Sequence, residues 1–196
     1  MTSKWQGYID GTITPPKETD VARQAREARA EREVSDRRLD NLKRAGVRDP
    51  AALAMIPFAD EAALATTAAM RGAMEHRAVL TMLFAGPAGS GKSWASYFLV
   101  REQSGGMLMS FCDVVPHESW NDVRPGAVKA ALLVIDDFGM GPLTAWRDAE
   151  VESIVCRRHE AGHRTVMSSN LPVTDVLRRF GDRFARRVGA VISCAK

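Results

Sequence analysis

An eight-residue run rich in glycine carries the clearest chemical pattern of the chain. The run is Gly86, Pro87, Ala88, Gly89, Ser90, Gly91, Lys92 and Ser93. Glycines at this spacing let the backbone curl so that its N–H groups point at phosphate oxygens, beside the positive end of the helix that follows. We expect Lys92 to reach the β- and γ-phosphates of ATP and the Ser93 hydroxyl to join the shell of a Mg²⁺ ion.

Two adjacent carboxylates follow the apolar run 132–135. An apolar strand of this kind places Asp136 and Asp137 at the C-terminal edge of a sheet, where ligands bind in α/β folds. Asp136 is expected to hold Mg²⁺, directly or through water, and Asp137 to polarise the water that attacks the γ-phosphate. The alternative is that adjacent acidic residues only cap a turn.

Polar residues further along the chain add candidates. Asn170 follows the apolar run 165–168 and is in place to orient the attacking water, although an asparagine before a turn is often structural. Arg183 and Arg187 are four residues apart, so a helix would put both on one face. Such an arginine can stabilise phosphate charge in a neighbouring subunit, and the alternative is a solvated or DNA-contacting basic patch.

Strand and helix patterns alternate through most of the chain. Strands are predicted at 79–85, 107–111, 131–135, 165–169 and 190–193, and helices at 60–75, from residue 92 onward, at 144–160 and at 173–179. This alternation predicts an α/β fold with a parallel sheet covered by helices. We expect this fold to have a single hydrophobic core, which suits a chain of 196 residues.

The N-terminal residues have a different composition. Residues 1–17 resemble a tail, and residues 18–44 form a charged, alanine-rich helix with few apolar positions. We therefore divide the chain into an N-terminal tail and helical arm, 1–45, and an ATPase domain, 46–196. The arm is either a solvated helix laced with ion pairs or a surface that binds a partner.

Composition excludes several classes. The chain is 45% apolar and 26% charged, and no apolar run approaches the roughly 18 residues of a membrane span, so we expect no membrane association and a cytoplasmic protein. Three widely spaced cysteines exclude a disulfide framework, and we expect buried, reduced thiols. Trp94, Tyr97 and Trp146 are expected in the core. A net charge of +3 permits nucleic-acid binding without indicating it.

Three stretches resemble the AAA+ helicase-loader ATPases of the DnaC and DnaI type, and the similar transposition ATPase IstB. They are 83–86 leading into the glycine-rich loop, 133–139 with 142–146, and 168–172. The resemblance implies a P-loop AAA+ (ASCE) sheet flanked by helices, with the Asn170 strand between the other two strands of the site. It implies that Asn170 is sensor 1, that Arg183 or Arg187 is an arginine finger, and that no C-terminal lid follows.

The same resemblance implies partners. Family members use ATP and Mg²⁺ and form nucleotide-dependent homo-oligomers on DNA, and the loaders deliver a hexameric replicative helicase to single-stranded DNA. Residues 114–129 are shorter than the helical insertion of the family, and the arm lacks the usual helicase-binding domain and zinc ligands. Asp137 stands where a glutamate is more general, which predicts weak hydrolysis.

Two other functions remain open. One is a transposition regulator that acts on duplex DNA with a transposase. The other is a small-molecule kinase, which would need a substrate lid and an acceptor pocket that we cannot place within residues 114–129.

Overall fold

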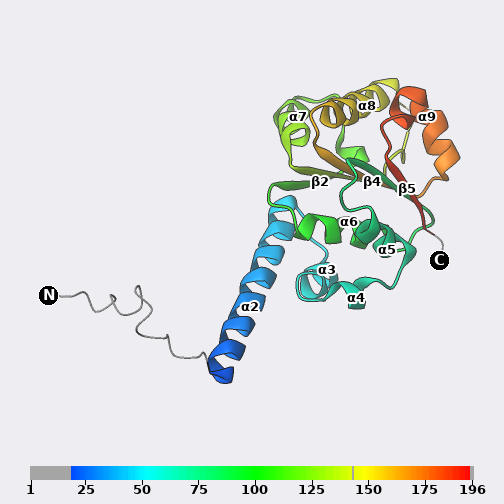
Figure 1. Ribbon diagram of the computed structural model, residues 1–196. Helices are drawn as coiled ribbons and strands as arrows, with labels where there is room; N and C mark the ends of the chain where they lie inside the picture. The colour runs from blue at the N-terminus through cyan, green and yellow to red at the C-terminus, as the bar shows by residue number, and fades with distance from the viewer. Residues whose placement is uncertain (1–18, 143, 195–196) are drawn as a thin grey trace, which may run out of the picture. The chain divides into compact units, whose positions relative to one another are not determined.

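The strand order places three chemically distinct strand ends side by side. In the computed structural model, which describes residues 19–142 and 144–194, the strands are β1 (Thr81–Ala85), β2 (Gly106–Ser110), β3 (Leu132–Asp136), β4 (Arg164–Ser169) and β5 (Ala190–Ser193). They form one sheet in the order β2-β3-β4-β1-β5, and every neighbouring pair is parallel (Figure 1). β4, the strand before Asn170, therefore lies between β1 and β3, as predicted.

Helices cover both faces of the sheet. They are α2 (Asp20–Ala45), α3 (Pro50–Met55), α4 (Glu61–Leu64), α5 (Ala68–Glu75), α6 (Lys92–Arg101), α7 (Glu118–Lys129), α8 (Ala145–Glu160) and α9 (Val173–Ala185), with a 3₁₀ turn at Phe111–Asp113. Helices α5 and α6 pack on one face, and α7, α8 and α9 pack on the other (Figure 1). The result is a three-layer α/β domain.

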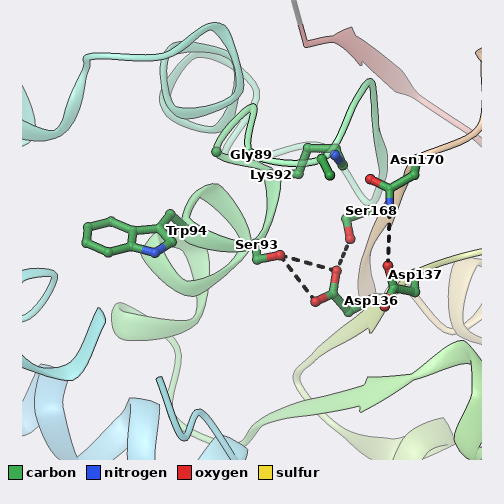
Figure 2. A pocket seen from close by; sticks show the side chains of 10 residues that line it. Gly89, Lys92, Ser93, Trp94, Asp136, Asp137, Ser168 and Asn170 are labelled. Carbon is green, nitrogen blue, oxygen red and sulfur yellow. Dashed lines mark hydrogen bonds between the residues drawn. The ribbon is translucent and has the colours of Figure 1, made fainter. Parts of the chain in front are cut away.

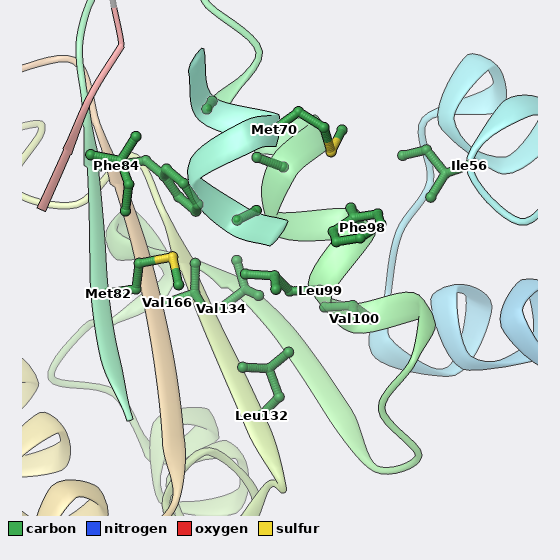
Figure 3. Close-up of a cluster of buried hydrophobic side chains, with 14 of the residues drawn as sticks. Ile56, Met70, Met82, Phe84, Phe98, Leu99, Val100, Leu132, Val134 and Val166 are labelled. Carbon is green, nitrogen blue, oxygen red and sulfur yellow. The ribbon is translucent and has the colours of Figure 1, made fainter. Parts of the chain in front are cut away.

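The continuous apolar strands reflect burial on both faces. All five residues of β1 are buried, as are the first four of β3. Met82 and Phe84 point toward α5 and α6, and Leu99 of α6 points back toward the sheet (Figure 3). Leu83, between them in sequence, belongs to the cluster on the opposite face, because successive side chains of a strand alternate.

The predicted helix 60–75 is wrong in one respect, because it is two helices. The Asp60 carboxylate accepts a hydrogen bond from the Ala63 amide at 2.7 Å and starts α4. The Thr67 hydroxyl accepts one from the Met70 amide at 3.1 Å and starts α5. Threonine is an N-cap residue, and this second cap ends the run that alanine propensity alone would continue.

Helix α2 contributes to two compact units, 1–34 and 35–196. Of the first unit, residues 19–33 are exposed and carry local ion pairs such as Arg29–Glu33 at 3.0 Å. In the second unit Leu42 is buried, and the Asn41 amide donates a hydrogen bond to the Arg101 carbonyl at 2.9 Å. The packing thus divides the chain before the predicted boundary at 45/46, which remains a prediction about function. The predicted tail, residues 1–17, lies outside the described residues.

Two placements predicted from residue type are wrong. Cys112 is exposed, whereas Cys156 and Cys194 are buried free thiols as expected. Trp146 is 42% exposed, because the buried positions of α8 fall at 151, 154, 155, 156 and 158, a stripe whose i, i+3, i+4 spacing extrapolates to 147 and 148 and misses 146. Trp94 and Tyr97 are half-buried against the core. Within the described ranges no helix is long and apolar enough to cross a bilayer.

Arg158 is a fully buried side chain that holds the N-terminal edge of the sheet together. Its guanidinium donates hydrogen bonds to the carbonyls of Ala127, Val128 and Ala130, at 2.7, 3.0 and 2.8 Å, and to the Thr165 hydroxyl at 3.0 Å. Burial lowers the pKa of Arg158 to about 10, so the group is still charged at pH 7. The side chain satisfies the last carbonyls of α7, which have no partner within the helix.

Replacing this side chain should unfold the protein at lower urea concentration. Arg158→Met leaves several buried carbonyls without donors, and we expect a loss of about 3–5 kcal/mol in the free energy of unfolding. The matched control is Arg157→Met, at an exposed position of the same helix. Equal urea midpoints for the two variants would contradict this role.

Candidate phosphate-binding and hydrolysis site

The glycine-rich run forms a loop between β1 and α6, as its pattern predicts. Gly91 has φ 86° and directly precedes α6, and a Cβ there would approach the Thr67 hydroxyl to 2.8 Å. A Cβ on Gly86 would lie 2.0 Å from the Cys194 carbonyl oxygen. Glycine is thus required at both places, by backbone conformation and by close packing. The loop is held against the N-terminus of α6, where the helix dipole favours anions.

Lys92 lies within this loop and is only 7% exposed. Its ammonium donates hydrogen bonds to the carbonyls of Gly86 and Pro87, both at 2.8 Å. Burial lowers the pKa of Lys92, and the charges of Asp136 and Asp137 act in the opposite direction. The two hydrogen bonds therefore hold the ammonium against the backbone of the glycine-rich loop.

The Asp136 carboxylate is the centre of a hydrogen-bond cluster (Figure 2). It accepts a hydrogen bond from the Ser93 hydroxyl, 3.2 Å from Oδ2, and a short one from the Ser168 hydroxyl to Oδ1. Ser93 and Asp136 thus lie together, as the sequence predicts. Ser168 was not predicted as a site residue; a hydroxyl near the end of an apolar central strand is the signal that could have indicated it.

This pair of oxygen donors suits Mg²⁺. The ion prefers hard oxygen ligands and keeps several waters, so one or two protein groups suffice when phosphate supplies the rest. Within the described residues no cluster of three or more His, Cys, Asp and Glu side chains could hold a metal. Ser93 and Asp136 are the residues that would hold Mg²⁺ here, together with oxygens from phosphate or water.

Asp137 and Asn170 face each other across the ends of β3 and β4. The Asn170 amide donates a hydrogen bond to the Asp137 carboxylate at 3.3 Å. Asp137 has φ 53°, a left-handed conformation that costs energy in residues other than glycine. Burial raises the pKa of Asp137, Asp136 raises it further, and Lys92 lowers it. A more basic carboxylate is a better acceptor for a proton from water.

One cavity of about 430 Å³ brings most of the predicted residues together. Its lining is Ala88, Gly89, Gly91, Lys92, Ser93, Trp94, Asp136, Asp137, Ser168 and Asn170. The volume is that of a small-molecule site. Trp94 was predicted only as a core residue, yet it lines this cavity; its ring points away from Asp136 (Figure 2).

Arg183 and Arg187 do not line the cavity. Arg183 is 63% exposed and makes a loose ion pair with Glu152, 3.9 Å between Nε and the carboxylate. Arg187 is 19% exposed and bonds to Glu160 at 3.0 Å. Both follow Gly181, where the backbone of α9 departs from helical geometry. They do not reach the phosphate loop of their own chain, so any action on phosphate would have to be on another subunit.

Comparison with known proteins defines the fold. No protein-family model and no curated protein matches the chain. A crystal structure of DnaI aligns with 65% of this chain and 83% of DnaI, at 16% identity and a TM-score of 0.51. AMPPCP-bound DnaA from Aquifex aeolicus aligns with 64% of this chain and 44% of DnaA, at 16% identity and a TM-score of 0.53.

A structure of DnaA bound to AMPPCP and single-stranded DNA is similar to the same extent, at 14% identity and a TM-score of 0.53. The chain covers 44% of that protein too. The fold is therefore that of the P-loop AAA+ ATPases, which confirms the predicted fold class. The resemblance to DnaI-type helicase loaders is confirmed as a likeness of fold, which is what identities of 14–16% support.

The strained, proton-favouring site of Asp137 yields a test. A carboxyl whose pKa is raised by folding stabilises the protein while protonated, and that stability is lost as pH rises through the folded-state pKa. Asp137→Asn removes the cost of keeping a buried carboxylate charged at pH 7. It also places asparagine, which tolerates positive φ, at this position. We expect the variant to melt roughly 1–3 °C higher at pH 7, with the gain shrinking as pH falls.

Differential scanning fluorimetry from pH 4 to 8 measures this difference. Asp122→Asn, at an exposed position of α7, is the matched control and should melt with the wild type. If the Asp137→Asn variant melted higher by the same amount at every pH, the backbone conformation at residue 137 would be the only cause of the gain.

Proposed function

We propose that this protein is an ATP-dependent switch that binds Mg²⁺-ATP in the cavity above β1, β3 and β4. The observation that carries the proposal is the hydrogen bond between Ser93 and Asp136 beside the buried ammonium of Lys92. Together these groups offer one cation for the phosphates and two oxygen donors for the metal. Mg²⁺, when bound, neutralises charge that develops on the phosphates.

The chain's own residues then divide the work of hydrolysis. Asp137 accepts a proton from the attacking water, and Asn170 fixes the direction of the Asp137 carboxylate through its hydrogen bond. An aspartate reaches less far than a glutamate, so we propose slow turnover. Slow hydrolysis suits a protein whose bound nucleotide decides its partners.

We further propose that the protein acts as a helicase loader in the cytoplasm, assembling on single-stranded DNA and delivering or remodelling a hexameric replicative helicase. The support is the stretches 133–139 and 168–172 of the sequence together with the fold shared with DnaI. The kinase alternative is disfavoured, because α7 packs against α8 through the ion pair of Arg124 with Glu150 and contributes nothing to the cavity. A transposition regulator would prefer duplex DNA to single-stranded DNA, so comparing the two kinds of DNA separates this alternative from a helicase loader.

The DNA and helicase assignment predicts nucleotide-dependent binding. With ATP and Mg²⁺ the protein should bind a fluorescent oligo-dT at least tenfold more tightly than a duplex of equal length, by anisotropy, and should co-elute with the replicative helicase of its host. Lys92→Ala should lose both effects, since it lacks the phosphate counter-charge. Tighter binding to duplex and no helicase in any nucleotide state would reject the loader assignment.

A truncation locates the helicase contact. A variant beginning at Ser35 keeps Leu42 and Asn41, which pack in the second unit, and removes the exposed part of α2. Under this proposal it hydrolyses ATP normally and no longer binds the helicase.

For the arginine finger we propose Arg183 acting in trans, since Arg187 is largely buried and ion-paired. Arg183→Ala should bind ATP normally and hydrolyse it at least tenfold more slowly. Mixing it with Lys92→Ala should restore part of the activity, because the second variant binds no ATP but supplies an intact Arg183 to its neighbour. Arg178→Ala, on the same helix and exposed, is the control. Failure of the mixture to recover any turnover would exclude action in trans.

A further inference from the structure

A second cavity, of about 400 Å³, lies at the edge of the sheet opposite the phosphate loop. It is placed where α6 ends at Arg101 and where β4 begins at Arg164, whereas the phosphate loop meets the start of α6. Arg38, Arg77 and Arg164 line it, with Glu61, Glu102 and the ring of Phe98. All of these residues belong to the second compact unit.

Most of the charges around this cavity are paired. Arg77 binds Glu61 through two hydrogen bonds, at 2.7 and 3.1 Å. Glu102 accepts from Arg38 at 2.8 Å and from Arg101 at 2.9 Å. Three guanidinium groups therefore share two carboxylates. Arg164 adds a fourth positive charge, so the cluster keeps an excess of positive charge.

Arg164 is the unpaired member. Its Nε and Nη2 atoms are buried and have no hydrogen-bond partner among the described residues. Burial also lowers the pKa of Arg164, because desolvation disfavours the charged form. A desolvated cation without a partner is costly, so an unpartnered guanidinium at the wall of a cavity calls for an explanation such as a bound ion.

The missing partner should be an anion with several oxygens. Guanidinium groups bind phosphate through paired N–H···O contacts, more specifically than ammonium groups do. A phosphate that carries between one and two negative charges matches the excess charge of the cluster. A cavity of about 400 Å³ also has room for the group that bears this phosphate, next to the apolar ring of Phe98.

We propose that this cavity binds the phosphate of a small phosphorylated ligand, with Arg164 as its main contact and Arg38 and Arg77 beside it. The site is separate from the nucleotide cavity, with which it shares no lining residue. The proposal does not depend on ATP hydrolysis or on a helicase partner. The same oxygen chemistry occurs in a DNA backbone, so the test includes a nucleic-acid arm.

The test uses inorganic pyrophosphate and the full chain carrying Lys92→Ala, which weakens anion binding at the phosphate loop. Calorimetric titration at constant ionic strength should show saturable binding. Adding Arg164→Met, which keeps an apolar stem, should weaken binding at least tenfold, and Arg164→Lys should weaken it less. Adding Arg178→Met, at an exposed arginine of α9, should change nothing.

Melting without any anion checks that the variants fold and gives a second readout. Arg164→Met should melt higher than its parent, because it removes an unpaired buried cation, and it should lose the rise that pyrophosphate produces in the parent. Equal pyrophosphate affinity with and without Arg164→Met, or no saturable binding in the parent, overturns the proposal. Binding of oligo-dT that depends on Arg164, in the absence of any pyrophosphate binding, would also overturn the proposal.

Discussion

The hydrogen bonds to the Asp136 carboxylate are the interaction on which the proposed nucleotide site depends. They join Ser93 at the start of α6, Asp136 at the end of β3 and Ser168 at the end of β4. These groups are far apart in sequence and can meet only because β4 lies between β1 and β3. The strand order of the parallel sheet therefore fixes the distance between the glycine-rich loop and the Asp136 carboxylate.

Much of this arrangement follows from local patterns. The spacing of Gly86, Gly91 and Lys92 predicts a loop whose form needs only a strand before it and a helix after it. Two acidic residues directly after an apolar strand predict that their carboxylates lie at the C-terminal edge of the sheet. The place of β4 came from the family resemblance, since parallel order cannot be deduced from the residues of one strand. Ser168 was missed because a serine inside an apolar run has no pattern that separates a site hydroxyl from a core one.

Other errors arise from tertiary context. Thr67 ends a run of helix-favouring residues through a single hydroxyl, and its role depends on the packing beneath the phosphate loop. Arginine content is the more instructive case. The net charge of +3 permits nucleic-acid binding without indicating it, and the structure gives one reason for this caution: Arg158 and Arg101 are fully buried and bond to backbone carbonyls of distant segments. Some arginines of this fold serve as hydrogen-bond donors within the core, so the arginine content of the sequence says little about binding partners.

The contact of Gly86 with Cys194 has a consequence for how the chain matures during synthesis. The Cys194 amide donates a hydrogen bond to the Ala85 carbonyl at 2.7 Å, and β5 pairs along the whole of β1 beyond its first residue. The loop is thus braced by residues translated long after it. A nascent chain released up to α9 would contain every group proposed to bind or hydrolyse ATP and still lack the wall behind Gly86. Nucleotide binding should therefore begin only after β5 has been synthesised, which delays any assembly that depends on it.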